Sequence, residues 1–223
     1  MNVLSNEAWV ESEFGNCDFG DQRLNRRVMK IARSMIENPG GSINAQNLSW
    51  SETKAAYRFF QNAKTDFQKV TAPHMCKTLA ECDGKRVLLI GDITEINYTL
   101  HYATEGLGML GDGKGRGFQL YSCLALDTET EEIVGLASAQ INYRVRVPEG
   151  ETRTQRLARW KESDLWGASI KDIGAPKKNT EYVFVFDRGG DIFDVYGMAQ
   201  MQNCDWVVRA SQLKRVRSRG GYR

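Results

Sequence analysis

Apolar residues recur at helical spacing along the first third of the chain. The clearest helix runs from about Asp21 to Glu37, and its apolar face carries Leu24, Val28, Ile31 and Met35. Ser49 begins a Ser-x-x-Glu pattern, which is typical of a capped helix start. A third helix is expected over residues 66–82, with a breaker near Pro73. The pattern predicts an all-α domain over residues 1–83.

The period changes after Lys85 to that of β-strands. Short apolar runs predict strands at residues 86–98, 118–126, 133–140, 183–186 and 206–209. Helices are expected between the later strands, a charged and solvated one over about 151–172 and another over about 191–202. Three strands followed by alternating helices and strands indicate a mixed α/β domain over residues 84–223.

Two of these strands are continuous apolar runs that end in aspartate, Val87–Asp92 and Val183–Asp187. Continuous runs are typical of strands buried on both faces, and such sheets place ligand sites at strand ends. Two carboxylates at one edge of a sheet can share Mg²⁺ or Mn²⁺ and activate water against a phosphodiester. The alternative is that each aspartate only favours a turn.

Composition limits the classes of protein that fit this chain. The 41% share of hydrophobic residues permits a core. Five scattered cysteines without a C-x-x-C pair favour reduced thiols, and His74 with Cys76 lacks a second ligand pair for zinc. No secretion signal is present, and no apolar stretch approaches the ~20 residues of a membrane span. We therefore expect a cytoplasmic protein without a membrane partner.

The net charge of +2 hides two clusters of basic residues. Five cations lie opposite the apolar face of the 21–37 helix, namely Arg23, Arg26, Arg27, Lys30 and Arg33. Solvated faces usually mix signs, whereas Asp21 is the only acid at the N-terminal end of this helix. The stripe favours contact with nucleic acid phosphates over a plain solvated face. The basic tail 209–219 either serves a polyanionic substrate or is a disordered end.

A glycine-rich loop precedes the second strand. Gly106–Gly111 spells G-x-G-x-x-G, and Gly108–Lys114 spells the core of a phosphate-binding loop. A true loop of that kind needs Ser or Thr after the lysine, where Gly115 stands, and a helix after it, where a strand is expected. Lys114 and Arg116 are better suited to contact a nucleic acid backbone.

A series of short motifs runs in order from about Trp9 to Arg209. They are Phe14-Gly15, Asp18–Arg27, Pro39–Ile43, Glu52–Phe60, Asp92-Ile93-Thr94, Leu107-Gly108, Arg116-Gly117, Lys161-Glu162-Ser163 with Trp166, Phe186-Asp187-Arg188 and Asp191-Ile192. Together they resemble the cut-and-paste DDE transposases of the insertion sequence 4 family.

The resemblance implies a ribonuclease H-like catalytic core preceded by a helical domain that binds transposon ends. Asp92 matches the first acid of an Asp, Asp, Glu triad and Asp187 the second. Two Mg²⁺ ions, or Mn²⁺, would activate water to nick double-stranded DNA, and the freed 3′-hydroxyl would attack the other strand and later the target. A homodimer on DNA in a bacterial cytoplasm, at the nucleoid, is implied as well. The expected DNA contacts are Arg23, Arg26, Arg27, Lys30, Arg33, Ser42, Tyr57, Arg58, Lys114, Arg116, Arg188 and Arg209.

The third acid of that family lies in a Tyr-Arg-Glu type signature well beyond the second. The present sequence stops at Arg223, 36 positions after Asp187 (223 − 187), and no residue can be matched to that glutamate. We expect a fragment, a truncated element or one half of a protein completed by another chain.

Three functions are compatible with this sequence. The first is a DNA transposase with end recognition and two of three catalytic acids. The second is a DNA-binding remnant that inhibits intact transposase. The third is a small metal-dependent nuclease in which Glu95, Asp191 or Asp194 supplies the missing ligand. Glu95 is expected to point to the opposite face of its strand from Asp92, and Asp191 has helix capping as its alternative role.

Overall fold

The computed structural model describes residues 5–111 and 113–211. The chain forms two compact units that divide between Lys77 and Thr78. The division falls inside helix α5 (Phe67–Glu81), six positions before the predicted boundary at 83/84.

The N-terminal unit is helical. It contains α1 (Asn6–Phe14), α2 (Gln22–Glu37), α3 (Ile43–Gln46), α4 (Trp50–Phe60) and the first part of α5. Asp21 and Ser49 cap α2 and α4, as their side chains accept from the backbone N–H of Arg23 and Glu52. The three predicted helices are therefore confirmed. The breaker expected near Pro73 is wrong, because Pro73 lies inside α5 and the helix continues through it.

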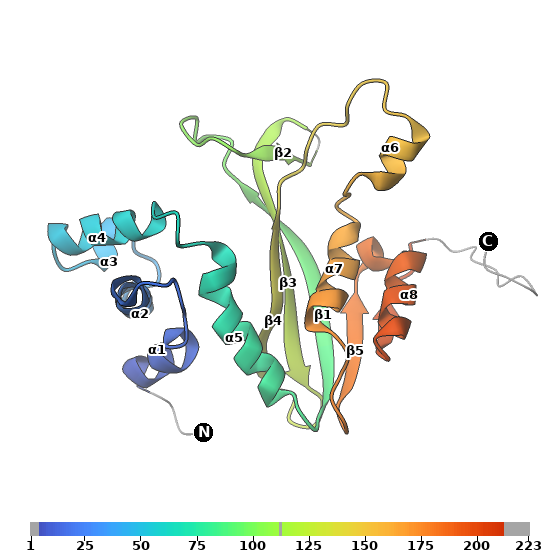
Figure 1. Cartoon of the computed structure of the whole chain (residues 1–223), viewed down its shortest axis with the longest axis horizontal. Helices are drawn as coiled ribbons and strands as arrows, with labels where there is room; N and C mark the ends of the chain where they lie inside the picture. The colour runs from blue at the N-terminus through green and yellow to red at the C-terminus, as the bar shows by residue number, and fades with distance from the viewer. Residues whose placement is uncertain (1–4, 112, 212–223) are drawn as a thin grey trace, which may run out of the picture. The chain divides into compact units, whose positions relative to one another are not determined.

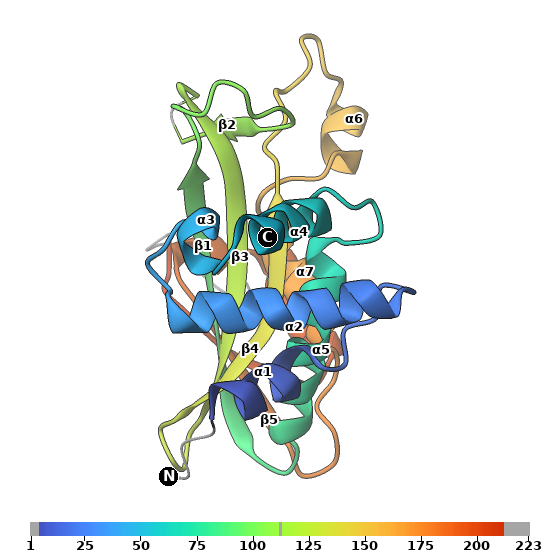
Figure 2. The ribbon, with the colours of Figure 1, turned by 90° about the vertical axis from the view of Figure 1, so that its left-hand side faces the viewer.

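One apolar cluster holds this unit together. Helices α3 and α4 both contact α2, which is the longest helix of the unit (Figure 2). The buried members of the cluster are Cys17, Phe19, Val28, Ile31, Ala56 and Phe59. The rings of Phe19 and Phe59 meet edge to face with their centroids 5.4 Å apart. The apolar face read from the sequence of α2 is thus the face that packs inward.

A buried carboxylate joins the first helix to the last helix of this unit. Glu13 of α1 is 5% exposed and accepts hydrogen bonds from His74 Nδ1, Lys77 Nζ and Ser12 Oγ. Burial opposes ionisation of Glu13, but the bonds from Lys77, His74 and Ser12 outweigh it and lower its pKa from 4.5. The charged carboxylate is therefore the form that stabilises the α1–α5 contact.

The C-terminal unit is built on one mixed sheet (Figure 1). Its strands are β1 (Arg86–Asn97), β2 (Gly108–Leu110), β3 (Gly115–Asp127), β4 (Ile133–Asn142), β5 (Glu181–Phe186) and β6 (Asp205–Val208). β1, β3 and β4 pair antiparallel in the order β4-β3-β1, and the short β2 extends the edge of β3. β5 and β6 continue from β1 as parallel strands. The predicted mixed α/β class is confirmed.

Helices follow β4, the strand predicted at 133–140, as expected, but they are not solvated throughout. The predicted 151–172 helix is two helices, α6 (Arg153–Ala158) and α7 (Asp164–Ile173). α7 buries Leu165, Trp166 and Ile170 in the sheet core, beside α8 (Phe193–Met201) (Figure 1). The expectation of a solvated helix is wrong for α7, because these residues recur at helical spacing and form an apolar stripe.

The two aspartate-terminated strands differ in burial. β5 is buried on both faces at Tyr182, Val183 and Phe184, as predicted. β1 alternates instead, with Val87 and Leu89 buried and Ile90 exposed. Leu124, Ile90, Val185 and Val207 pair in one row across four strands, and Val207 is 60% exposed. The expectation of two buried faces is therefore wrong for β1.

Aromatic rings fill the covered face of the sheet beneath β1. Trp166 of α7 meets Tyr121 and Phe186 edge to face, with centroids 5.4 and 5.0 Å apart. Gly91 lies directly over this cluster, where an added Cβ would clash with the Tyr121 hydroxyl and lie 3.0 Å from the Phe186 ring. The Tyr121 hydroxyl is fully buried and makes no hydrogen bond of regular geometry within the residues that the structure describes, with the Ser169 hydroxyl and the Cys123 thiol as its polar neighbours. Its burial raises the pKa of Tyr121 far above the ordinary value of 10.

Among residues 5–111 and 113–211, no helix is long and apolar enough to cross a membrane.

The Glu13 contact predicts a pH-dependent stability of the N-terminal unit. Because the folded-state pKa lies below 4.5, the contribution of Glu13 is present above pH 4.5 and is lost as pH falls through the folded-state value. Replacing Glu13→Gln should lower the free energy of unfolding by about 2 kcal/mol at pH 7 and weaken that acid dependence. Hydrogen exchange of α1 peptides in urea measures both. Glu11→Gln, an exposed neighbour on α1, is the control and should change neither quantity.

The unsatisfied hydroxyl predicts that Tyr121→Phe keeps or raises the stability of the C-terminal unit, by up to about 1 kcal/mol, because an unpaired buried polar group is removed. Gly91→Ala should destabilise this unit, and less so in the Tyr121→Phe background. Urea denaturation of the four proteins measures the coupling. A loss of more than about 1 kcal/mol in Tyr121→Phe alone would show that the hydroxyl has a partner.

Candidate functional site

Helix α2 presents its cations opposite the apolar core. Arg23 is 84% exposed on its side chain, and its guanidinium donates to both carboxylate oxygens of Asp21. The side-chain hydrogen bond from Arg23 holds the pKa of Asp21 at about 2. Arg23 therefore already carries a neutralising partner at the start of the helix.

Two further cations of the stripe meet acids from other helices. Arg27 has a side chain only 25% exposed and pairs with Glu52 of α4. Arg33 pairs with Glu7 of α1 at 3.3 Å. Arg26 and Lys30 are exposed one helical turn apart and have no carboxylate within 4.0 Å in the described part of the chain. These two are the cations of α2 best placed to neutralise phosphates.

The other predicted contacts of this unit are spread over α3 and α4. Ser42 caps α3 by accepting from the Ala45 N–H, and its side chain has that structural role. Tyr57 and Arg58 are both exposed in the last turns of α4. Arg58 therefore adds a cation near the C-terminal end of that helix.

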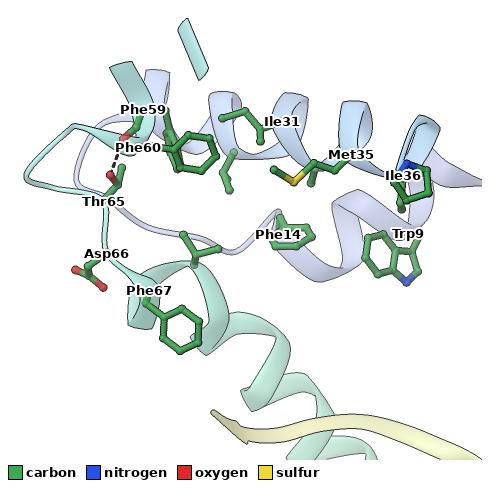
Figure 3. Close-up of a pocket in the computed structure, with 14 residues that line it drawn as sticks. Trp9, Phe14, Ile31, Met35, Ile36, Phe59, Phe60, Thr65, Asp66 and Phe67 are labelled. Carbon is green, nitrogen blue, oxygen red and sulfur yellow. Dashed lines mark hydrogen bonds between the residues drawn. The ribbon is translucent and has the colours of Figure 1, made fainter. Parts of the chain in front are cut away.

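The inward face of α2 borders an apolar groove of about 660 Å³ (Figure 3). Ile31, Met35 and Ile36 from α2 face rings contributed by α1, α4 and α5. The connection from α4 to α5 is fixed where the Thr65 hydroxyl donates to the Phe59 carbonyl at 2.6 Å. Since this apolar side and the cations occupy different faces of α2, the basic face is free of the unit's own core.

In the C-terminal unit, the parallel pairing of β1 and β5 aligns the two predicted acids. Ile90 of β1 pairs with Val185 of β5. Asp92 comes two positions after Ile90, and Asp187 comes two positions after Val185. Asp92 and Asp187 consequently line one cavity of about 450 Å³. Asp187 also caps the short 3₁₀ helix Arg188–Gly190, because its Oδ1 accepts from the Gly189 N–H at 2.7 Å. The alternative that this aspartate favours a turn is therefore correct for Asp187, which also lines the cavity.

Two glutamates line the same cavity, Glu95 of β1 and Glu162 before α7. Strand alternation predicted that Glu95 would face away from Asp92, but the cavity nonetheless extends along β1 to Glu95 and its cross-strand partner Gln119. Arg144, which follows β4, forms ion pairs with Glu95 at 3.4 Å and with Glu162 at 2.5 Å. Four carboxylates and one guanidinium therefore set the charge of this cavity.

The other proposed substitutes for a third ligand lie elsewhere. Asp191 is 6% exposed and accepts from Tyr196 Oη and from the N–H and hydroxyl of Ser211. Asp194 is exposed in the first turn of α8. Within the two described ranges, no three His, Cys, Asp or Glu side chains are placed to hold a metal ion together.

The remaining predicted DNA contacts flank the sheet. Arg116 of β3 is half-buried and donates to the Thr104 carbonyl at 2.7 Å, so it braces a loop of the unit. Lys114 and Arg188 are exposed. Arg209 is exposed where β6 leaves the sheet, and its N–H donates to the Phe186 carbonyl beside Asp187. Residues 212–219 of the predicted basic tail lie outside the described residues.

The glycine-rich loop leads into a strand, as the sequence predicted. β2 and β3 form a hairpin across Leu110 and Gly115. Gly108 packs against the backbone of Arg144, where a Cβ would lie 2.6 Å from the Arg144 nitrogen. This close approach is a structural reason for glycine at that position.

Sequence reasoning missed Arg144 and gave Glu162 no role. Arg144 stands in a loop without a motif of its own, and its partners are far away along the chain. The only sequence signal was Lys161-Glu162-Ser163, which belongs to the motifs that carried the resemblance.

A family model matches the helical unit. Residues 6–65 match the family described as transposase DNA-binding, a span that contains α1 to α4 and ends just before α5. The match supports a transposase N-terminal domain and confirms, at that coarser level, the expectation that DNA is a partner of this chain.

Proposed function

We propose that this protein is a DNA transposase of the DDE type, in which the helical unit binds transposon ends and the sheet unit carries the first two catalytic acids. The observation that carries the proposal is the alignment of Asp92 and Asp187 in one cavity of a chain whose residues 6–65 match transposase DNA-binding domains. Neither observation alone would indicate the reaction.

The strand arrangement supports a ribonuclease H-like core. The antiparallel strands β1, β3 and β4 are followed by the parallel strands β5 and β6. The order across the sheet is β4-β3-β1-β5-β6, the short β2 also pairs with β3, and helices follow β4 and β5. The first acid lies on the central strand and the second at the end of its parallel neighbour. Membership in the insertion sequence 4 family rests on the motifs quoted above.

The donor set of the cavity fits Mg²⁺ or Mn²⁺. Asp92 and Asp187 would hold the ion through carboxylate oxygens, the ligands that hard divalent cations prefer. When bound, such an ion lowers the pKa of water and stabilises charge on a phosphodiester.

The remaining steps of the proposal belong to the chain's own residues. Arg26, Lys30 and Arg58 would hold end-DNA phosphates, and Arg188 and Arg209 would hold the strand beside Asp187. Water would attack the phosphodiester and release a 3′-hydroxyl, which would then attack the opposite strand and later the target. As the resemblance implies, two copies of the chain would act on paired ends.

The first test concerns DNA binding through α2. Arg26→Ala or Lys30→Ala should weaken binding of end DNA and reduce the slope of log K against log salt by about 0.9 for each cation lost. Fluorescence anisotropy over a salt series measures both effects. Lys171→Ala, an exposed cation of α7, is the matched control. A salt slope unchanged by Arg26→Ala and Lys30→Ala together would contradict the assigned surface.

The second test concerns the aspartates. Asp92→Asn and Asp187→Asn should each weaken Mn²⁺ binding by at least about tenfold, while end-DNA binding without metal should not weaken. Mn²⁺ electron paramagnetic resonance and anisotropy provide the two readouts. Asp194→Asn serves as control, because Asp194 lies outside the cavity. If both Asp variants bound Mn²⁺ as tightly as the wild type, the proposed metal site would be wrong. DNA binding would then remain as the proposed function of the chain.

A further inference from the structure

Not every carboxylate around Asp92 and Asp187 is placed to bind a metal ion. Glu95 and Glu162 line the same cavity, yet no three ligand-type side chains in the described ranges are placed to share an ion. Arg144 supplies a physical reason for this, since both glutamates are its partners.

The guanidinium of Arg144 contacts two carboxylates and one backbone carbonyl. Nε and Nη2 donate to Glu162 Oε2 at 3.2 and 2.5 Å. Nη1 lies 3.4 Å from Glu95 Oε1 and donates to the Gly111 carbonyl at 3.4 Å. Charge-assisted bonds of this kind are stronger than neutral ones, so each glutamate gains by staying with Arg144.

The backbone of Arg144 is held as well. Its carbonyl accepts from the Met109 N–H of β2 at 3.4 Å, and Gly108 packs against its nitrogen. Because β2 holds its backbone, and one carboxylate from β1 and one from the segment before α7 contact its side chain, Arg144 is held beside the cavity.

We propose that Arg144 is a positioning residue that limits the metal affinity of this cavity by holding Glu95 and Glu162 as its own partners. The proposal rests on the function proposed above, in which Asp92 and Asp187 hold a divalent cation. Two effects act in the same direction. The guanidinium offsets one negative charge of the cavity, and it keeps Glu162 from turning toward the aspartates.

An alternative role for Arg144 is to bind a phosphate. The guanidinium does not fit that role, because its N–H groups already face carboxylates and a carbonyl. The two possible roles of Arg144 predict opposite effects of its removal. If Arg144 only supported the fold, its removal would loosen the cavity and weaken metal binding. If Arg144 restrains metal ligands, its removal strengthens metal binding.

Mn²⁺ binding to the full chain separates these roles. Arg144→Gln should tighten Mn²⁺ binding by about tenfold, measured as free Mn²⁺ by electron paramagnetic resonance at constant ionic strength. Arg144→Lys keeps the charge and should stay within about threefold of the wild type. Arg146→Gln, an exposed arginine of the same loop, is the matched control and should not change the affinity.

A second substitution assigns the gain to Glu162. In Arg144→Gln/Glu162→Gln, most of the tightening should be lost, because the released carboxylate is absent. Circular dichroism checks that each variant is folded, and if Arg144→Gln does not fold, Arg144→Met and Arg144→Met/Glu162→Gln replace the two variants, with the same expected gain in Mn²⁺ affinity and the same loss of that gain.

Unchanged or weaker Mn²⁺ binding in folded Arg144→Gln overturns the proposal, and so does tightening that survives Glu162→Gln. If instead the proposed metal site at Asp92 and Asp187 is wrong, the experiments give a different result. In that case Asp92→Asn and Asp187→Asn leave Mn²⁺ binding unaltered, whatever Arg144→Gln does.

Discussion

The parallel pairing of β1 with β5 is the constraint on which the candidate site depends. It brings together two strands separated by β2, β3, β4 and two helices, and its register sets Asp92 level with Asp187. A parallel pair requires a long crossover, and α7 completes that crossover by burying Trp166 against Tyr121 and Phe186. The same helix is preceded by Glu162 and Ser163, so the packing that closes the core also builds one wall of the cavity.

Charge in both units is balanced by residues distant in sequence. On α2, the ion pairs from Glu7 and Glu52 reduce a stripe of five cations to a smaller exposed set. In the sheet unit, Arg144 pairs with two of the four carboxylates of the cavity and offsets one of their charges. A net charge of +2 describes neither surface, because the sum averages a basic helix face with an acidic cavity. What a polyanion or a divalent cation meets is the local balance.

Local signals in the sequence predicted most of the elements, since caps, alternation and turn residues act over a few positions. Asp21 and Ser49 begin helices where their side chains indicate, and the glycine-rich loop leads into a strand. The sequence could not reveal that β1 has an exposed face, because a run such as Val87–Ile90 is equally apolar on both sides. Nor could it reveal Arg144, whose role is defined only by the fold that places it between β1 and α7.

The aspartate pair and its surroundings illustrate why the two kinds of information differ. Asp92 and Asp187 could be inferred because each ends a continuous apolar run, although β1 continues past Asp92 to Asn97 and only Asp187 follows the end of its strand. Their usefulness to a metal is decided by neighbours, however, and those neighbours compete. A glutamate bonded to a guanidinium is a poor ligand even when it lines the right cavity, because a bound cation must first replace a charge-assisted hydrogen bond. In the proposed metal site, the affinity for a cation would therefore depend on how the carboxylates are shared between Arg144 and the ion, rather than on how many carboxylates line the cavity.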